Sequence, residues 1–300
     1  MERPLDSETV DKFHGDGFVA MEQLVSPQEA ERMRAVLLRL HETRVGFNEG
    51  AQFDAAGCDT ADNRPRFPQI LNPSNYAKEL LTTSYRNTAT AIAKQLLGQD
   101  ARLQLDIAFF KPARIGSDTP WHQDEAFSNP DLEHDQITIW LALAPISRNN
   151  SCMSFIPGSH KLPVLEHRAK DGDPRNHALE CIGTFDAATA VECPLQAGGA
   201  TIHSHRTLHY AGPNPSSEYR IGYALVFDTP FRLRKKPLVF GWQQHQQLTD
   251  RQLRKRAWRR HGGIIVELWR GRQLARNHLA AKLPRIFHKL RGNTKQDFTG

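Results

Sequence analysis

The chain has 300 residues, of which 39% are apolar and 24% charged, and its formal net charge is +6. This length and composition suit one large domain, or one domain with an appendage, and no apolar run reaches the roughly 18 residues that a membrane-spanning helix needs. The amino terminus is polar without an apolar signal segment, and the four cysteines (Cys58, Cys152, Cys181 and Cys193) lack zinc-site or disulfide-framework spacing, so we expect a cytoplasmic protein with reduced thiols.

The first hundred residues predict two helices separated by a long loop. The segment Ser26–Glu29, SPQE, combines an N-cap serine, a proline at the first helical position and a glutamate at the third, so a helix should begin there. Apolar residues at helical spacing predict a second helix over about 74–97, which Gly98 would end. Residues 46–73 are rich in Gly, Asn, Asp and Pro, and their length is typical of a disordered loop or a lid.

From residue 101 to 228 the sequence changes to short apolar or alternating runs broken by Pro, Gly and Asn. Many short strands with turns between them are typical of a sandwich or a barrel. The predicted strands are 103–111, 136–144, 152–156, 200–209 and 219–227.

The segment TPWHQDEAF, residues 119–127, places a histidine and an aspartate two positions apart. In a strand, residues i and i+2 point to the same side, so His122 and Asp124 would project together. One imidazole and one carboxylate are two of the three groups that hold Fe(II) in the facial triad of non-haem oxygenases. An isolated H-x-D triplet also arises by chance, so a third ligand is required.

Three histidines at the end of the strand predicted over 200–209 could supply that ligand: His203, His205 and His209. If the run is extended, all three lie on one face of the strand. Periodicity therefore does not choose between them.

The strand predicted over 219–227 carries an arginine in an unusual setting. Arg220 alternates with Gly222 and Ala224, so a guanidinium shares one face with two small residues. Such a group needs an anionic partner and has room for one. A dicarboxylate cosubstrate would provide a metal-chelating end and a carboxylate for this arginine.

These features stand within a longer pattern. The segments WHQDEAF, IWLAL, FIPGSHK and HYAGPNPSSEYRIGYALVF, in this order, resemble the phytanoyl-CoA dioxygenase-like branch of the Fe(II)/2-oxoglutarate-dependent oxygenases. The opening FHGDGFVAMEQLVSPQEAERMRAVL is also similar to that family's amino-terminal segment, so the resemblance covers residues 10 to 230 or so. It implies a mainly β protein with flanking helices, whose core is a double-stranded β-helix, the cupin-like jelly roll.

The resemblance also implies the identity of the metal ligands. Carried over residue by residue, it makes His122, Asp124 and His209 the ligands of iron. It implies no ligand role for His203 or His205, which the residues alone left as alternatives.

Other positions follow from the resemblance or depart from it. Arg220 would hold the distal carboxylate of 2-oxoglutarate, and Trp140 would lie near the cosubstrate, although a tryptophan in a buried strand is equally consistent with core packing. The family commonly has Asn-Gly where this chain has Asn150 and Ser151, so a different backbone geometry is expected there. Lys111, just before the motif, is expected to be solvated rather than to meet an anionic substrate group.

The implied reaction uses Fe(II), 2-oxoglutarate and O2. It hydroxylates an unactivated C–H of a small-molecule or carrier- or lipid-linked metabolite and releases succinate and CO2. Halogenating relatives replace the aspartate by a small residue, so the presence of Asp124 favours hydroxylation or a related oxidation over halogenation. Desaturation, epoxidation and cyclisation remain alternatives, as does a non-catalytic cupin-like scaffold, which would have no need of the triad and Arg220 together. Shared family features do not identify the substrate.

The carboxyl-terminal part differs in charge from the rest. Residues 231–300 contain 18 Lys and Arg against three acidic residues, whereas residues 1–230 contain 21 basic and 30 acidic residues. We therefore divide the chain into an oxygenase domain, 1–230, and a basic helical extension, 231–300, with a helix expected after Thr249, a break at Gly262 and Gly263, and a basic amphipathic segment over 264–290.

Three roles of this extension are open. It could pack back on the acidic body, or it could make peripheral contact with an anionic membrane or an acidic carrier protein. Nucleic-acid binding is disfavoured, because aromatic residues are few and no recognition motif accompanies the charge.

Overall fold

The structure, a computed structural model, describes residues 4–57 and 64–270, and its core is built from two antiparallel sheets. The larger sheet has the order β1-β12-β7-β14-β4-β3-β2 and the smaller one β11-β8-β13-β5. The strands of the larger sheet are β1 (Phe18–Met21), β2 (Gln52–Asp54), β3 (Pro68–Leu71), β4 (Arg102–Lys111), β7 (Gln136–Ala142), β12 (Ala200–Ser204) and β14 (Arg220–Asp228). Those of the smaller sheet are β5 (Thr119–His122), β8 (Met153–Phe155), β11 (Val191–Cys193) and β13 (His209–Ala211).

Two short strand pairs and several α-helices accompany these sheets in the described part of the chain. The pairs are β6 (Leu132–Glu133) with β15 (Arg232–Leu233), and β9 (His167–Ala169) with β10 (Leu179–Cys181). The α-helices are α1 (Ser7–Asp16), α2 (Pro27–Glu42), α3 (Ser84–Leu97), α4 (Gly241–His245) and α5 (Asp250–Trp258).

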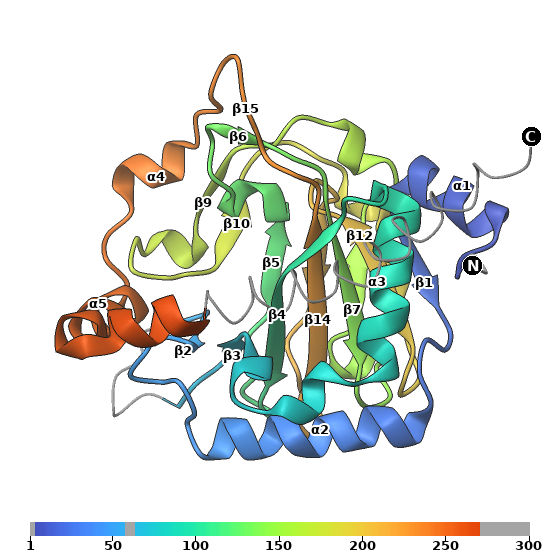
Figure 1. Ribbon diagram of the computed structural model, residues 1–300. Helices are drawn as coiled ribbons and strands as arrows, with labels where there is room; N and C mark the ends of the chain where they lie inside the picture. Colours follow the sequence, from blue (N-terminus) through green and yellow to red (C-terminus); the bar gives the residue numbers. More distant parts are fainter. Residues whose placement is uncertain (1–3, 58–63, 271–300) are drawn as a thin grey trace, which may run out of the picture.

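Helices cover one face of the larger sheet. In Figure 1, α3 stands against this sheet and α2 runs along its base, while α5 lies beside β2 and α4 beside β9 at the other side. Ala89 and Ile92 of α3 are fully buried in the main core, and the Tyr85 hydroxyl donates to the carbonyl oxygens of Ile139 and Tyr223 on two central strands. This anchoring fixes the helical layer on the outer face of the sheet and leaves its other face to the smaller sheet.

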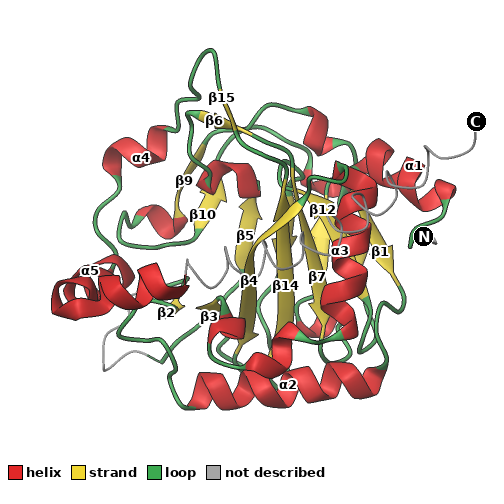
Figure 2. Ribbon diagram, viewed as in Figure 1, coloured by secondary structure: helices red, strands yellow, loops and turns green. Residues whose placement is uncertain are grey.

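The inner faces of the two sheets enclose a second, smaller core. Trp140 and Ala224 of the larger sheet belong to the same buried cluster as Phe155 and Ala211 of the smaller one. The Phe18 and Phe155 rings stack across the interface at 4.6 Å between centres. Figure 2 shows the strands gathered in the middle and the helices at the periphery. The predicted mainly β jelly roll with flanking helices is confirmed.

The amino-terminal predictions hold in part. The helix α2 begins at Pro27, with the Ser26 hydroxyl accepting from the Glu29 amide, as predicted. The second helix starts ten residues later than predicted, at Ser84, because Thr83 caps it and residues 73–81 form two 3-10 turns instead. The loop prediction for 46–73 is also wrong where β2 and β3 pair with each other and extend the sheet beyond β4.

The strand prediction for 200–209 is wrong in a way that matters for the site. The chain turns after Ser204, whose carbonyl oxygen accepts from the Thr207 amide, and so divides the run into β12 and β13. These two strands belong to different sheets. The three histidines therefore do not share one strand face.

The carboxyl-terminal extension packs on the body as far as it is described. The predicted capping box of Thr249 and Gln252 opens α5, and Gly262 adopts a left-handed conformation at the predicted break. Arg251 and Arg254 of α5 donate to carbonyl oxygens of Gly50 and Phe47. Of the predicted amphipathic segment, residues 271–290 lie outside the described part.

Two further expectations concern cysteines and membranes. Cys152, Cys181 and Cys193 are free thiols, and Cys58 lies outside the described residues. No helix formed by residues 4–57 and 64–270 combines the length and apolar character needed to cross a bilayer.

Candidate functional site

Two histidines meet on neighbouring strands of the smaller sheet. His122 at the end of β5 pairs directly with His209 at the start of β13, and their ring centres are 4.0 Å apart. The Nδ1 atom of His122 lies 2.8 Å from the Pro120 carbonyl oxygen, and that of His209 lies 3.0 Å from the Thr207 carbonyl oxygen. Since a carbonyl oxygen only accepts, both rings must carry their proton on Nδ1, which leaves each Nε2 lone pair free for a metal.

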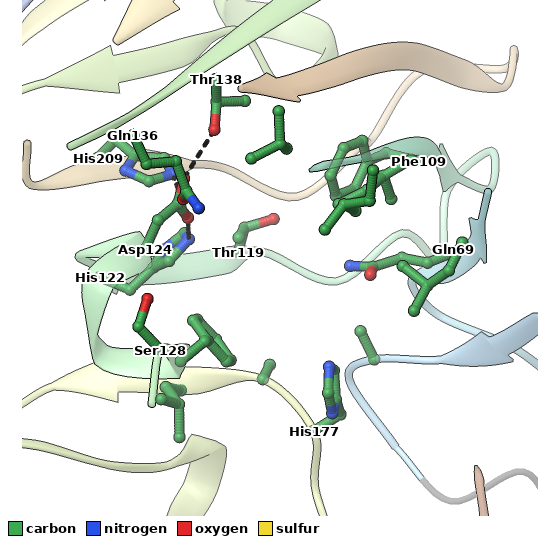
Figure 3. Close-up of a pocket in the computed structure, with 18 of the residues that line it drawn as sticks. Gln69, Phe109, Thr119, His122, Asp124, Ser128, Gln136, Thr138, His177 and His209 are labelled. Atoms are coloured by element: carbon green, nitrogen blue, oxygen red, sulfur yellow. Dashed lines mark hydrogen bonds and ion pairs between the residues drawn. The ribbon is translucent and has the colours of Figure 1, made fainter. Parts of the chain in front are cut away.

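Asp124 joins these histidines, although not from a strand. β5 ends at His122, and Asp124 opens a 3-10 turn over Asp124–Phe127. The two side chains lie close together as predicted, but strand periodicity is not the cause. Its Oδ1 atom lies 3.5 Å from the Nε2 atom of His122 and 3.7 Å from that of His209. Figure 3 shows the three side chains converging at one end of a cavity.

The second carboxylate oxygen is held from the larger sheet. The Thr138 hydroxyl of β7 donates to Asp124 Oδ2 at 3.1 Å, which fixes the plane of the carboxylate. The prediction missed Thr138, although its position two residues before Trp140 on one strand face was a usable signal.

The protonation states of this cluster suit a divalent cation. Burial opposes ionisation of Asp124, but the neighbouring imidazoles, that of His209 first, outweigh it and hold the pKa of this carboxyl well below its usual range. Burial and the nearby His122 ring lower the pKa of His209 well below its usual value. Ionised carboxylate and neutral imidazole are the forms that bind metals.

The cluster fits the metal that the sequence suggests. One candidate ligand atom each from His122, Asp124 and His209 all lie within 4.8 Å of one another, so a single ion can reach all three. Two imidazoles and one carboxylate on one side, with the other side open to a cavity, form the facial arrangement of non-haem Fe(II) sites.

The two other histidines take different places. His203 on β12 is buried, its Nε2 atom lies 3.5 Å from Asp124 Oδ2, and neither ring nitrogen has a hydrogen-bond partner among the described residues. His205 instead accepts from the Gln136 amide and faces Glu125, away from the cluster. The structure thus brings His209 into the three-residue group and leaves His203 beside it.

Arg220 and Trp140 face the same cavity from the larger sheet. The guanidinium carbon of Arg220 lies 4.3 Å from the centre of the Trp140 ring. Only 4% of Arg220 is exposed, and its Nε and Nη2 atoms have no hydrogen-bond partner within the described ranges. Burial lowers the pKa of Arg220 to about 9. A buried cation of this kind is costly unless an anion pairs with it, so the cavity is suited to an anion at this point.

The cavity itself has a volume of about 750 Å³ and reaches from Arg220 and the His–Asp–His cluster to the molecular surface. In Figure 3, Gln69, Phe109 and His177 lie across the cavity from the cluster. A volume of this size is in the range of small-molecule sites and leaves space beyond a small diacid.

Comparisons with known proteins agree with this geometry. The pattern of the phytanoyl-CoA dioxygenase (PhyH) family matches residues 13–222. The chain belongs to this family. Among curated relatives of this family member, a probable alpha-ketoglutarate-dependent hypophosphite dioxygenase of Stutzerimonas stutzeri is 29% identical over 218 residues, covering 69% of this chain and 74% of the relative. Phytanoyl-CoA dioxygenase domain-containing protein 1 of Danio rerio is 23% identical over 257 residues, covering 73% and 88%.

Solved structures of similar proteins extend the comparison. EvdO2 of Micromonospora carbonacea var. aurantiaca, crystallised in complex with 2-oxoglutarate, is 32% identical with a TM-score of 0.69, covering 79% of this chain and 96% of EvdO2. The non-haem alpha-ketoglutarate-dependent carbocyclase SnoK shares the fold at 21% identity and a TM-score of 0.60, covering 82% and 92%. The family recognised from the sequence is therefore confirmed, and with it the assignment to the Fe(II)/2-oxoglutarate-dependent oxygenases.

In this member of the phytanoyl-CoA dioxygenase family, the small residues beside Arg220 do not simply leave room for an anion, as the sequence analysis inferred. A Cβ atom built on Gly222 would collide with the indole of Trp140, so the room next to the arginine holds that ring. Glycine is required here because only it lets the tryptophan lie against β14 and flank the guanidinium.

Gly222→Ala is accordingly expected to destabilise the protein by about 1–3 kcal/mol, the usual range for overpacking a core, and to weaken 2-oxoglutarate binding by displacing Trp140. Denaturant unfolding and a 2-oxoglutarate titration would measure the two effects. Gly15→Ala is the matched control, since no atom lies within 4 Å of a Cβ atom at that position. Equal stability of the two variants would contradict the proposed contact.

The structure contradicts the expectation for Lys111 and describes the backbone at Ser151. Lys111 is not solvated: it is fully buried, donates to the carbonyl oxygens of Ala211 and Gly212, and has a pKa held well below its usual value by burial. It thereby ties β4 to the end of the strand that carries His209. Ser151 adopts the left-handed conformation that glycine favours, with φ of 78°, so the backbone there keeps a glycine-like form.

A buried ion cluster behind the metal site also escaped the sequence analysis. Glu125, next to Asp124, is paired with Arg206 at 2.7 Å and with Arg234 of the extension at 2.6 Å, and it faces His205 at 3.2 Å. Two arginines on one buried carboxylate satisfy both of its oxygens, so this cluster holds the turn that carries Asp124. No local signal connected these residues, which lie far apart in the sequence.

Proposed function

We propose that the protein is an Fe(II)/2-oxoglutarate-dependent hydroxylase in which His122, Asp124 and His209 hold the iron and Arg220 holds the distal carboxylate of 2-oxoglutarate. The observation that carries this proposal is the coexistence, in one cavity, of a three-ligand cluster within 4.8 Å and a buried arginine without a partner among the described residues. A binding protein without turnover would gain nothing from both features together.

The chain's own residues have distinct tasks in this proposal. Bound Fe(II) supplies the activation of O2 that couples oxidative decarboxylation of 2-oxoglutarate to oxidation of a substrate C–H. The carbonyl oxygens of Pro120 and Thr207 orient the histidine ligands, and Thr138 orients Asp124. Arg220 and Trp140 position the cosubstrate, and the surrounding apolar walls keep water away from the reacting atoms.

Hydroxylation is proposed over halogenation because the carboxylate ligand is present at Asp124 and is held by Thr138. The test is succinate formation from 2-oxoglutarate with Fe(II) and O2 in the presence of a small-molecule panel, followed by mass analysis of the products. A mass gain of one oxygen in a saturated substrate supports hydroxylation, whereas loss of two hydrogens indicates desaturation or cyclisation. Absence of any succinate above the metal-free background would favour the non-catalytic scaffold.

We also propose that residues 1–230 form the oxygenase domain and that residues 231–300 form an extension whose end makes peripheral contact with an anionic surface. The support is a group of exposed apolar side chains, Ile265, Leu268 and Trp269, next to the basic residues of the same helical region. Exposed fractions of 60–70% for these three side chains leave an apolar patch of the kind that enters a lipid headgroup layer.

A variant ending at residue 258 is expected to lose co-sedimentation with phosphatidylserine vesicles, because each basic residue near such a surface contributes about 1 kcal/mol. Vesicle pelleting of the full chain and the shortened chain measures this. Phosphatidylcholine vesicles provide the control, to which neither form should bind. Equal binding of both forms to the anionic vesicles would reject the contact.

A further inference from the structure

The wall of the cavity opposite the metal cluster is an uncovered apolar sheet face. On β4, Ala108 and Phe110 point into the main core and are fully buried, whereas Leu105, Ile107 and Phe109 alternate with them and line the cavity while only partly buried. An apolar strand face of this size is normally covered by a second layer. In this molecule the space in front of it is the cavity.

The charged groups of the cavity are few. The lining contains one arginine, Arg220, and two carboxylates, Asp124 and Asp228, and the described part of the chain contributes no lysine to it. Asp228 accepts a hydrogen bond from Gln136 at 2.7 Å. Burial lowers the pKa of His177 to about 3, so that this ring in the cavity wall is neutral. Arg220 is therefore the one Lys or Arg side chain that the described lining offers to a phosphate or carboxylate of a substrate.

The cavity lining contains side-chain amides rather than further cationic groups. Gln69 on β3, Gln104 on β4 and Gln246 after α4 line the cavity, and none of the three makes a side-chain hydrogen bond within the described segments. A primary amide offers both donors and acceptors, so it can pair with carbonyl and hydroxyl groups, and it carries no charge to neutralise an ion. Together with the apolar floor, these amides match a molecule that has one apolar side and several neutral oxygen functions.

Part of the cavity wall is formed by residues outside the segment that matches the family. The family match ends at residue 222, yet Phe231, Trp242 and Gln246 of the extension line the cavity. The Trp242 indole donates to the carbonyl oxygen of Ala126, in the turn that carries Asp124, at 3.2 Å. The extension is thus fixed to the metal-binding turn and forms part of the cavity wall.

The nearby basic residues of α5 do not alter the conclusion that the cavity lining contains few cationic groups. Arg251 and Arg254 donate to backbone carbonyl oxygens of Gly50 and Phe47, and their guanidinium groups lie over the rings of Phe53 and Phe47. Neither arginine lines the cavity.

We propose that the organic substrate bound in this cavity is an uncharged amphiphilic molecule with carbonyl or hydroxyl groups, and that residues 231–246 of the extension form the wall that selects it. The inference rests on the proposed oxygenase function, and it names the substrate class of that site. This substrate class differs from that of an enzyme whose cavity binds an anionic acyl carrier.

Two fluorescent probes of the same scaffold test the claim about charge without any turnover. N-phenyl-1-naphthylamine is neutral, and 8-anilinonaphthalene-1-sulfonate is the same molecule with one sulfonate. Titrated into the full-length protein with saturating 2-oxoglutarate, at high salt to screen the basic surface, the neutral probe should bind at least about ten-fold more tightly, because the sulfonate would be desolvated without a partner. Equal or tighter binding of the sulfonate, or no fluorescence from the neutral probe, would overturn the proposal.

Variants of the extension test its part in selection. Trp242→Ala should weaken binding of the neutral probe by about ten-fold, the effect expected for truncating a central aromatic contact. Gln246→Lys should tighten binding of the sulfonate by placing a cation at the cavity, whereas Gln244→Lys, an exposed neighbour that does not line the cavity, should leave it unchanged. The two lysine variants alter exposed residues, so they decide the question even if Trp242→Ala fails to fold.

The outcomes also separate this inference from the proposed function. Identical probe affinities for Gln246→Lys and Gln244→Lys would remove the selecting role of the extension even if succinate is formed. Conversely, probe binding as expected without any succinate formation would leave the cavity chemistry intact and reject the oxygenase.

Discussion

His209→Ala is expected to lower Fe(II)-dependent succinate formation by at least about 1,000-fold, equivalent to roughly 4 kcal/mol in the activation free energy. His209 offers one of three candidate ligand atoms that lie within 4.8 Å of one another, and its Nε2 atom is left free by the Nδ1 hydrogen bond to Thr207. Alanine leaves two ligands, which cannot hold the ion in a facial arrangement. Iron content after desalting, measured together with succinate, would show whether the loss of activity follows loss of metal.

Two further variants make this result interpretable. His245→Ala removes an exposed histidine of α4 and should keep full iron content and activity. His203→Ala tests the neighbouring histidine, which the sequence left as an alternative ligand and which lies 3.5 Å from Asp124 Oδ2. Iron retention by His209→Ala together with iron loss by His203→Ala would reassign the third ligand.

Arg220→Met is expected to raise the Kd of 2-oxoglutarate by about 100-fold, since removing one partner of a buried charge pair costs on the order of 3 kcal/mol. In the protein without cosubstrate, the same change is expected to raise the free energy of unfolding. The reason is that Arg220 is 4% exposed and its Nε and Nη2 atoms have no partner among the residues described, so the folded state without 2-oxoglutarate carries an uncompensated buried cation.

The opposite signs of these two effects distinguish a ligand-binding arginine from a structural one. Thermal unfolding with and without 2-oxoglutarate gives both numbers in one experiment, because a bound ligand raises the melting temperature by mass action. Arg148→Met, which removes an exposed arginine paired with Glu192, is the control and should change neither quantity appreciably. A large loss of stability in Arg220→Met with unchanged cosubstrate affinity would show that Arg220 serves only the fold.

The sequence determined those features whose cause lies within a few residues. The start of α2 follows from Ser26, Pro27 and Glu29, and the start of α5 follows from Thr249 and Gln252, because capping is a local hydrogen-bond pattern. The motif around the metal site was recognisable for the same reason. Its residues are close in the chain or stand at a fixed spacing within a family pattern.

How distant segments meet depends on the three-dimensional packing of the whole chain. The turn after Ser204 sends β12 and β13 to different sheets, and it is this separation that places His209 against His122 and leaves His203 across the site. Strand register and sheet membership depend on partners far away in the sequence, which periodicity within one strand cannot specify. The burial of Lys111 has the same origin, since its acceptors belong to β13 and the residue after it.

The extension gives the clearest example of this division. Its composition predicted a basic, helical segment, and nothing in its residues indicated that Trp242 would contact the turn carrying Asp124 or line the substrate cavity. Helix formation and charge are properties of a segment by itself. The wall that the segment builds depends on a surface formed by other parts of the chain, so it exists only once the whole chain has folded.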